Sequence, residues 1–496
     1  MSMGQLRFIV PRGERLDEAA VQRAYLGGMD HVPWPTTTEW DGKTLIVERE
    51  VRESGTLSIP WTVAGHGELV LTTSSLMERK APYLLPLELA RGTVHRLRAQ
   101  LAAWQLIGYR PSDAVREQVS DAQESFMRAA MEQGTPEAMC DDADRTLEYA
   151  LTAIESACSE FAQASLRSRQ SQTPTLNTLL GAVVESPPLD AKSAKWTLAS
   201  FNAAQLRLTW SETEQEQGIR SFAAAENQLQ WCREHQLKVL AGPLFRPSRR
   251  SWPTWIDPRG NFETTHRQLL EYTEDVVRYF QGRVHVWHAV SAVAGDNETR
   301  LSEEQRLRLA VSVIETVRRL DPRTPIVVSF DQPWGEYMTR RHFDLSPMHF
   351  ADMLVRSDLG VAGLGMEINF GYDSRATWPR DLLEFNRQID HWSTLGLPLL
   401  LFLSAPSAPG LDAYASEPAS PNSRVGPLGP SQEWQKRFVE QAVPFLISKP
   451  AVHSVFWNQL RDEVPHDFAH GGLFDIHGAR KPAIESLADF RQKHLT

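Results

Sequence analysis

The chain has 496 residues, with 52 Lys and Arg against 62 Asp and Glu, a formal charge of −10 and an apolar content of 42%. This length exceeds that of one ordinary domain, so we expect two or three domains with a large core. The net negative charge gives no overall attraction to phosphate backbones, and we expect no nucleic-acid partner. Three cysteines, an odd number without CxxC spacing, exclude a disulfide scaffold.

The first residues, MSMGQLRFIV, lack the basic region and apolar run of a signal peptide. No stretch of the sequence is long and apolar enough to predict a membrane-spanning helix. We therefore expect a cytoplasmic protein without a membrane partner. The sequence leaves the oligomeric state open.

Residues 1–86 predict a small β-domain. Short segments of strand character, LRFIV, TLIVEREV, TLSIPWTV and ELVLTT, are separated by turn residues at 40–43 and 65–67. Alternating apolar positions between short turns favour a two-sheet β-sandwich, an architecture that many sugar-binding modules share. Because fold does not determine function, carbohydrate binding by this domain is only one possibility.

Residues 87–168 predict a helical segment, with apolar positions spaced by three and four residues over 87–107, 112–133 and 136–168. Start signals stand at residues 111–113 and 135–137. The polar run SLRSRQSQTPT at 165–175 predicts a linker before the second half of the chain.

Residues 176–492 predict a (β/α)8 TIM barrel of the α/β class. Eight short apolar runs alternate with amphipathic helical segments, and buried parallel strands have this continuous apolar character. The runs are LLGAVVE, AAQLRLTW, KVLAGPL, VHVWHAV, PIVVSF, VAGLGMEI, PLLLFL and HSVFW, which begin at residues 179, 203, 238, 284, 325, 361, 398 and 453.

Several segments of this half resemble the family 10 glycoside hydrolases, whose best-known members are xylanases. The C-terminal residues are the nearest match: Phe456-Trp457, then GLFD at 472–475, Gly478 and KPA at 481–483 are similar to the family pattern F-W-x…G-L-L-F-D…G-x-x-K-P-A. The segments FNAAQLRLTW, VWHAVSA and GLGMEIN are similar to the family's strands two, four and six. The resemblance implies a barrel that acts on or binds a β-linked oligo- or polysaccharide without a cofactor.

The chain departs from the family where catalysis takes place. A retaining glycosidase needs two carboxyl groups about 5–5.5 Å apart, one as acid/base and one as nucleophile. Carried over by the resemblance, the acid/base position falls on Ala292 and the nucleophile position near Leu403, and neither is a carboxylate. The usual catalytic pair is therefore missing.

Active sites of barrel enzymes lie at the C-terminal ends of the strands, so carboxylates that replace the missing pair are expected there. Glu367 ends the sixth predicted strand and Asp331 ends the fifth, so this pair is our candidate for relocated catalytic carboxylates. The alternative for Glu367 is an ion pair with Arg207 or Arg246, and the alternative for Asp331 is helix capping. The candidate substrate-binding residues are Trp210, Arg207, Arg246, His288, Trp334, Asn369, Trp457, Asn458 and Asp462. Arg249 and Asp296 also follow predicted strands.

The candidate tryptophans could stack on sugar rings, or they could fill the core. His466 and His470 flank Asp467 near Asp462 and Glu463, but the surrounding prolines and glycines predict a loop rather than the helix face that such ligand spacing prefers. We therefore expect no metal site.

The sequence is compatible with three functions. A diverged glycoside hydrolase would cleave a glycosidic bond with Glu367 and Asp331 or Asp462, whereas a pseudoenzyme would bind carbohydrate without cleaving it. A protein-interaction scaffold that uses the helical segment is a third possibility.

Overall fold

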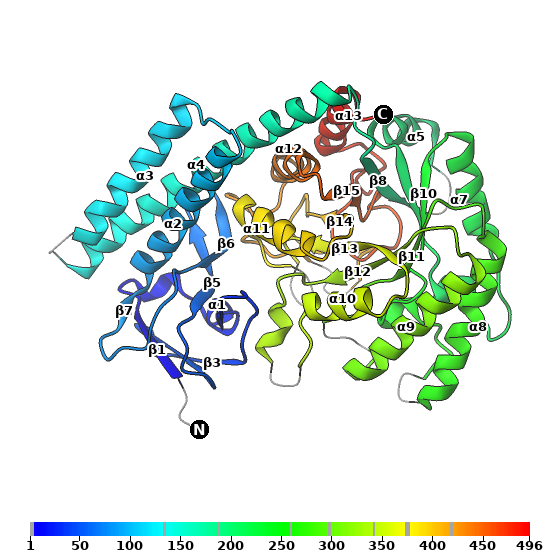
Figure 1. The fold of residues 1–496 in the computed structure, drawn as a ribbon, viewed down its shortest axis with the longest axis horizontal. Coiled ribbons are helices and arrows are strands. Elements are labelled where there is room, and N and C mark those ends of the chain that lie inside the picture. The colour runs from blue at the N-terminus through cyan, green and yellow to red at the C-terminus, as the bar shows by residue number, and fades with distance from the viewer. Residues whose placement is uncertain are drawn as a thin grey trace.

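The computed structural model describes residues 4–131, 135–185, 189–257, 260–295, 299–340, 343–372, 377–416 and 420–496. Two small sheets and a group of long helices lie beside a closed barrel (Figure 1). Asp296 lies outside the described residues. Within the described part of the chain, no helix is long and apolar enough to cross a membrane.

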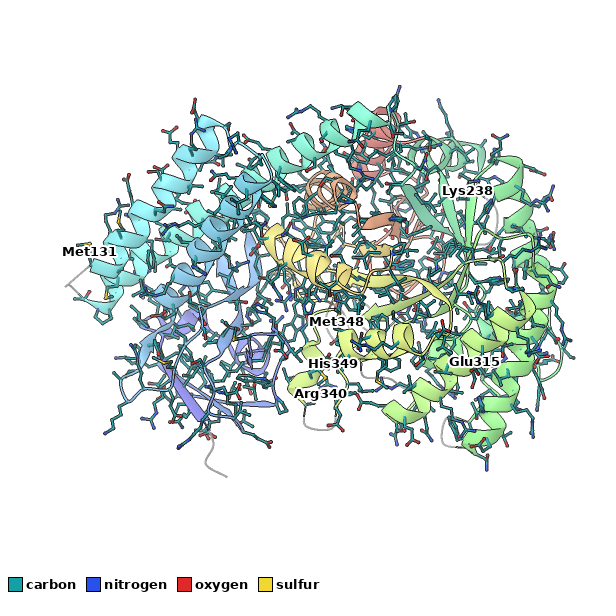
Figure 2. All side chains as sticks on the ribbon, in the orientation of Figure 1. Met131, Lys238, Glu315, Arg340, Met348 and His349 are labelled. Atoms are coloured by element: carbon teal, nitrogen blue, oxygen red, sulfur yellow. The ribbon has the colours of Figure 1, made fainter. Side chains whose placement is uncertain are left out.

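Eight parallel strands close the barrel in the order β10-β11-β12-β13-β14-β15-β8-β9. They are β8 (Leu179–Val184), β9 (Ala203–Leu206), β10 (Lys238–Ala241), β11 (Val286–Val290), β12 (Ile326–Asp331), β13 (Val361–Asn369), β14 (Leu399–Ser404) and β15 (Val452–Trp457). All eight predicted strands are present, so the predicted TIM barrel is confirmed. Lys238, at the first residue of β10, marks the end of the barrel opposite the C-terminal mouth (Figure 2).

Amphipathic helices surround the barrel because each has one apolar face to bury against the strands. They include α5 (Ala191–Ser200), α7 (Ala223–Glu234), α8 (Phe262–Phe280), α9 (Glu303–Leu320), α10 (Pro347–Arg356), α11 (Leu382–Ser393), α12 (Gln432–Ser448) and α13 (Pro482–His494), with the short α6 (Trp210–Thr213) after β9. Ser302 begins α9 with a capping box that it forms with Gln305. These local signals agree with the strand and helix alternation of the sequence.

The barrel interior is filled by a small apolar cluster that is separate from the layer between strands and helices. Its buried members are Ala203, Leu240, Val327, Leu400, Phe402 and Phe456. Large rings require small neighbours: a Cβ added at Gly181 would overlap the Phe456 ring. The interior is therefore a packed core and not a channel.

The N-terminal part contains two sheets, one of order β3-β4-β1-β7 and one of order β2-β5-β6. Their strands are β1 (Gly4–Ile9), β2 (Tyr25–Gly27), β3 (Thr36–Trp40), β4 (Thr44–Arg49), β5 (Thr56–Val63), β6 (Gly67–Thr72) and β7 (Tyr83–Leu84), and α1 (Glu18–Gln22) follows β1. Leu6 and Phe8 of the first sheet and Leu57 and Ile59 of the second belong to one buried apolar cluster. The division of the chain into the three predicted domains stays a prediction.

Three long helices follow the sheets: α2 (Leu85–Leu106), α3 (Asp113–Met131) and α4 (Pro136–Gln172). Helix α4 continues through most of the segment 165–175, where the sequence predicted a linker. The polar run remains helical because Leu166 is buried and the Arg169 side chain donates to the carbonyl of Ile447 in α12. This segment therefore packs against the barrel instead of separating two parts of the chain.

The N-terminal part is held against the barrel by backbone and side-chain bonds. Two amides of β6 donate to barrel loops, Glu68 to the Arg424 carbonyl at 3.0 Å and Val70 to the Pro379 carbonyl at 2.8 Å. Arg96 of α2 pairs with Asp381 at 2.7 Å and with Glu384 of α11 at 3.1 Å. The edge of the second sheet is thus covered by the barrel loops.

We expect Phe402→Ala to lower the free energy of unfolding by about 3–5 kcal/mol, because the substitution leaves a cavity inside the barrel where Phe402 is 1% exposed. Chemical denaturation measures this loss. Leu428→Ala, at a side chain that is 99% exposed, is the control and should change stability by about 0.5 kcal/mol or less. Equal effects of the two variants would contradict the packed interior.

Candidate functional site

The mouth of the barrel carries buried polar side chains above the apolar interior. Ser329 and Asp331 stand in register with Gly365 and Glu367 of the neighbouring strand, so that Asp331 and Glu367 are direct neighbours on β12 and β13. Both carboxylates are buried, at 7% and 4% exposure. The two predicted catalytic candidates therefore lie on one wall of the barrel.

Glu367 is held by three donors. Its Oε1 accepts hydrogen bonds from the hydroxyl groups of Ser291 and Ser329, both at 2.6 Å, and its Oε2 lies 3.5 Å from Arg246 Nη1. Burial by itself would raise the pKa of Glu367, but Arg246 and the two serines outweigh it and hold this pKa below its ordinary value. Glu367 is therefore ionised at neutral pH. Of the two arginines that the sequence offered as ion-pair partners of Glu367, the structure places Arg246 beside it.

A chain of hydrogen bonds through the barrel leads to the same carboxylate. Gln205 donates to His288 Nδ1 at 3.3 Å, and His288 Nε2 lies 2.7 Å from the Ser329 hydroxyl group. Because Ser329 must donate to ionised Glu367, His288 donates through Nε2, which defines a neutral imidazole. Burial lowers the pKa of His288 to about 4, in agreement with a neutral imidazole.

Asp331 is in the opposite electrostatic situation. Burial, and then the neighbouring Glu367 charge, raise the pKa of Asp331 to about 6. Its hydrogen-bond donor is the Gly295 amide, at a long distance of 3.4 Å. The two neighbouring carboxyl groups thus have pKa values that are shifted apart.

The inward-facing positions of the seventh strand bear no carboxylate. Phe402 belongs to the inner cluster and stacks on His288 with ring centroids 5.0 Å apart, and Ser404 donates to Asn369 Oδ1 at 2.7 Å. Leu403 packs in the outer layer between strands and helices. On the fourth strand, Ala292 follows β11 with a positive φ of 53°. Neither family position therefore supplies a group for proton transfer or attack.

The structure places three other predicted polar residues at the mouth. Asn458 donates to Asn369 Oδ1 at 2.7 Å, and Arg207 pairs with Asp467 at 3.0 Å. Asp467 also pairs with Arg250 at 2.8 Å, and these arginines lower its pKa although burial opposes them. The sequence did not identify Asp467 as the partner of Arg207, because the two residues are 260 positions apart.

Glu185 was also missed, although it directly follows the first strand. It is 7% exposed, and its Oε1 accepts the Leu460 amide at 2.9 Å. Burial raises the pKa of Glu185. Its position after the first apolar run was the available signal. Arg249, which follows the third predicted strand, donates to the Ile256 carbonyl at 3.1 Å.

The predicted tryptophans are enclosed by protein. Trp210 is 2% exposed, with the Tyr272 ring stacked at 5.5 Å and its indole nitrogen donating to Glu214. Trp457 is also 2% exposed and donates to the Gly471 carbonyl at 2.9 Å. Trp334 lies outside the mouth, under the Arg380 guanidinium at 5.0 Å. All three have contacts typical of core residues, and sugar stacking stays a prediction.

A hollow of about 50 Å³ opens at the mouth beside these residues. Ligand pockets are commonly roughly 300–1,000 Å³, so this hollow has room for a substituent of a ligand. Neither Glu367 nor Asp331 lines it. Its polar lining consists of Gln205, Arg207, Thr209, Arg246, Ser251, Asn458 and Asp467, with Trp210 at one side.

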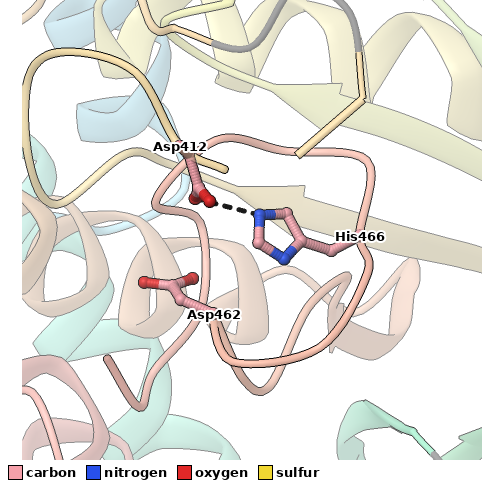
Figure 3. A group of neighbouring side chains, drawn as sticks. All are labelled: Asp412, Asp462 and His466. Atoms are coloured by element: carbon pink, nitrogen blue, oxygen red, sulfur yellow. Dashed lines mark hydrogen bonds and ion pairs between the residues drawn. The ribbon is translucent and has the colours of Figure 1, made fainter. Parts of the chain in front are cut away.

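The geometry brings Asp412, Asp462 and His466 together in the loops near this end (Figure 3). Their possible ligand atoms already have partners. Asp462 accepts hydrogen bonds from the Gln459 side chain and the Gly472 amide and forms a buried ion pair with Lys481. His466 lies 3.0 Å from Asp412 through Nε2 and 2.8 Å from the Val464 carbonyl through Nδ1. A metal ion would have to displace these donors, so we interpret the group as a structural network.

Comparisons with known proteins add the following. No family model and no curated protein matches the sequence. Similar solved structures include native xylanase 10B from Thermotoga maritima, 17% identical with a TM-score of 0.48, over 65% of this chain and 98% of the xylanase. Xylanase 10B from Thermotoga petrophila RKU-1 in complex with xylobiose is 17% identical with a TM-score of 0.48, over 66% of this chain and 97% of that chain. A GH10 structure from Paenibacillus barcinonensis is 15% identical with a TM-score of 0.47, over 67% and 98% of the two chains.

The barrel is similar in fold to these xylanase structures. The likeness concerns the fold.

We expect Asp331→Asn to change how stability depends on pH. The pKa of Asp331 is about 6 in the folded protein and near 4, its ordinary value, in the unfolded chain. The folded protein therefore keeps the Asp331 proton to a higher pH than the unfolded chain does. The free energy of unfolding therefore falls as pH rises from about 4 to about 6, by about 2–3 kcal/mol for this group. Urea unfolding from pH 4 to pH 8 should show this fall in wild type and its loss in Asp331→Asn. Parallel pH profiles would contradict the shifted pKa.

We expect Lys481→Met to lower the free energy of unfolding by about 3–5 kcal/mol, because it leaves Asp462 buried without its ammonium partner. Thermal unfolding of Lys481→Met and of Lys481→Met/Asp462→Asn checks this, and the double variant should recover part of the loss. If Zn²⁺ raised the melting temperature of wild type through Asp412, Asp462 and His466, the structural interpretation would be wrong.

Proposed function

We propose that the barrel is a family 10-like carbohydrate-binding protein that does not cleave its ligand. The observation that supports this function most directly is the separation of the two carboxylates from the hollow at the mouth. The hollow is lined by Arg207, Arg246 and Asn458, whose side chains suit hydroxyl groups, whereas Glu367 and Asp331 are buried outside it. The ligand would be a short β-linked oligosaccharide.

In this proposal the buried network positions the binding groups. Glu367 orients Arg246 by an ion pair, and Asn369 orients Asn458 by accepting from its amide. Because the hollow is small, the oligosaccharide lies across the mouth and places one hydroxyl-bearing substituent in it. Preorganised donors of this kind bind without the loss of side-chain freedom that mobile ones incur.

The pKa values favour one second candidate, hydrolysis by relocated carboxylates. Asp331, with a pKa of about 6, is suited to donate a proton, and its neighbour Glu367 is ionised. Two carboxyl groups whose environments separate their pKa values are the usual arrangement for acid and base roles. Against this candidate, both groups lie on adjacent strands of one wall, whereas glycosidase carboxyl groups flank the scissile bond.

We expect calorimetry to detect binding of xylo- or cello-oligosaccharides, and Asn458→Ala to weaken it about tenfold, which corresponds to about 1.4 kcal/mol for a lost hydrogen bond. Reducing-end release from the same oligosaccharides should be absent. Glu315→Gln, at an exposed residue of α9 (Figure 2) that does not line the hollow, is the control and should bind as wild type does.

Three results would decide between the candidates. Binding without release supports the proposed function. Release that Asp331→Asn abolishes, with binding retained, supports the hydrolase. Neither binding nor release would contradict both and favour the interaction scaffold.

A further inference from the structure

A large cavity lies away from the barrel mouth, between the second N-terminal sheet, α2 and α11. Its volume is about 420 Å³, within the range of roughly 300–1,000 Å³ that is common for ligand pockets. Exposed His95 and Ala99 of α2 are part of its wall, so the cavity reaches the protein surface. Such pockets are frequent where two parts of a chain meet.

One wall of this cavity consists of hydroxyl-bearing residues of the sheet and the turn after it. They are Thr56, Ser58, Thr72, Thr73, Ser74 and Ser75. Ser58 and Thr72 share a hydrogen bond of 2.9 Å, and Thr73 binds the Leu57 amide at 3.0 Å. Hydroxyl groups donate and accept, so this wall can match hydroxyl groups of a ligand.

The opposite wall carries three guanidinium groups, from Arg96, Arg380 and Arg387, and one carboxylate, from Glu384. Arg387 binds Glu384 Oε2 through Nε at 3.0 Å and through Nη2 at 2.8 Å. Arg96 binds the other oxygen of Glu384 at 3.1 Å. A single carboxylate is therefore shared by two arginines.

Behind this wall, Asp381 pairs with Arg96, and Glu336 pairs with Arg380 at 3.1 Å. Three guanidinium groups thus face three carboxylates, so the charges balance, but the hydrogen bonds do not. The Nε atoms of Arg96 and Arg380 are buried without a hydrogen-bond partner in the described structure. Within the same described residues, Arg387 uses Nε and Nη2 but not Nη1. Arginine donates five hydrogen bonds and accepts none. The two Nε atoms are enclosed by protein, so Nη1 of Arg387, which lines the cavity, is the donor left for a ligand.

His31 also lines the cavity, and the positive charge of this wall affects its pKa. Burial, and then the positive charge of Arg387, lower the pKa of His31 to about 4. His31 is therefore neutral at physiological pH and does not compete for an anion. An oxyanion is the acceptor that best matches unused guanidinium donors, because carboxylate and phosphate oxygens fit their planar fork.

We propose that this cavity binds a hydroxylated oxyanion, a sugar acid or a sugar phosphate, with its anionic group on Arg387 and its hydroxyl groups on the Ser and Thr wall. The site goes beyond the function proposed for the barrel mouth and does not depend on it. It joins the sheet to α11, so the ligand would also stabilise the contact between the N-terminal part and the barrel.

The test is calorimetric titration of the full chain with D-glucuronate, D-glucose 6-phosphate and D-glucose. We expect at least one of the two anions to bind and D-glucose to bind at least tenfold more weakly. Arg387→Gln should weaken anion binding at least tenfold, and Ala99→Phe should block it by filling the cavity from an exposed position. Glu384 keeps Arg96 as a partner in Arg387→Gln, and thermal unfolding without ligand checks that both variants are folded.

Two controls separate this site from the mouth of the barrel. Arg98→Gln changes an exposed arginine of the same helix outside the cavity and should leave binding unchanged. Glu367→Gln should also leave it unchanged, whatever becomes of oligosaccharide binding. The proposal is overturned if D-glucose binds as tightly as the anions, or if no probe binds at concentrations of about 10 mM. It is also overturned if Arg387→Gln and Ala99→Phe bind the anions as wild type does.

Discussion

The buried charge of Glu367 is the constraint on which the mouth of the barrel depends. An ionised carboxylate at 4% exposure is stable only when charged or polar groups replace the water that it has lost. Arg246 and two serines do so directly, and Gln205 and His288 fix the orientation of Ser329. Each donor in this chain points toward Glu367. One inward-facing polar residue on each of β9, β11 and β12 thus serves the carboxylate of β13.

The same principle operates where the N-terminal part meets the barrel. Glu384 and Asp381 are buried acidic residues at the start of α11. Arg96 from α2 pairs with both, and Arg387 gives Glu384 a second partner. Removing one partner of such a group leaves a buried charge, whereas the complete group contributes little net stability. The network thus specifies how the two parts meet more than how strongly they associate. It also leaves arginine donors beside the cavity with too few acceptors.

The sequence predicted all eight barrel strands because parallel strands covered on both faces are continuous apolar runs. It could not predict the inner cluster, since Phe402 and Leu403 are both apolar and only the register of β14 separates an inward from an outward side chain. The sequence predicted a linker where α4 continues to Gln172, because residues 165–172 are polar. These residues stay helical through tertiary contacts: Leu166 is buried and Arg169 donates to the Ile447 carbonyl of α12. Arg207 and Asp467 meet across 260 residues, which no local pattern encodes.

Register also explains why carboxylates at Leu403 and Ala292, the two positions that the sequence resemblance assigns to catalysis, would fit this barrel poorly. A glutamate at Leu403 would place its charge in the apolar layer between β14 and the helices, where an unpaired carboxylate is strongly disfavoured. A glutamate at Ala292 would have to adopt a φ of 53°, a conformation that side chains other than Asn, Asp and Gly rarely take. On β14 the inward-facing positions nearest the mouth are Phe402, stacked on His288, and Ser404, bound to Asn369. Replacing either would disturb the network that keeps Glu367 and Asn458 in place. The mouth is thus organised around a different set of polar contacts, and its chemistry has to be judged from those contacts.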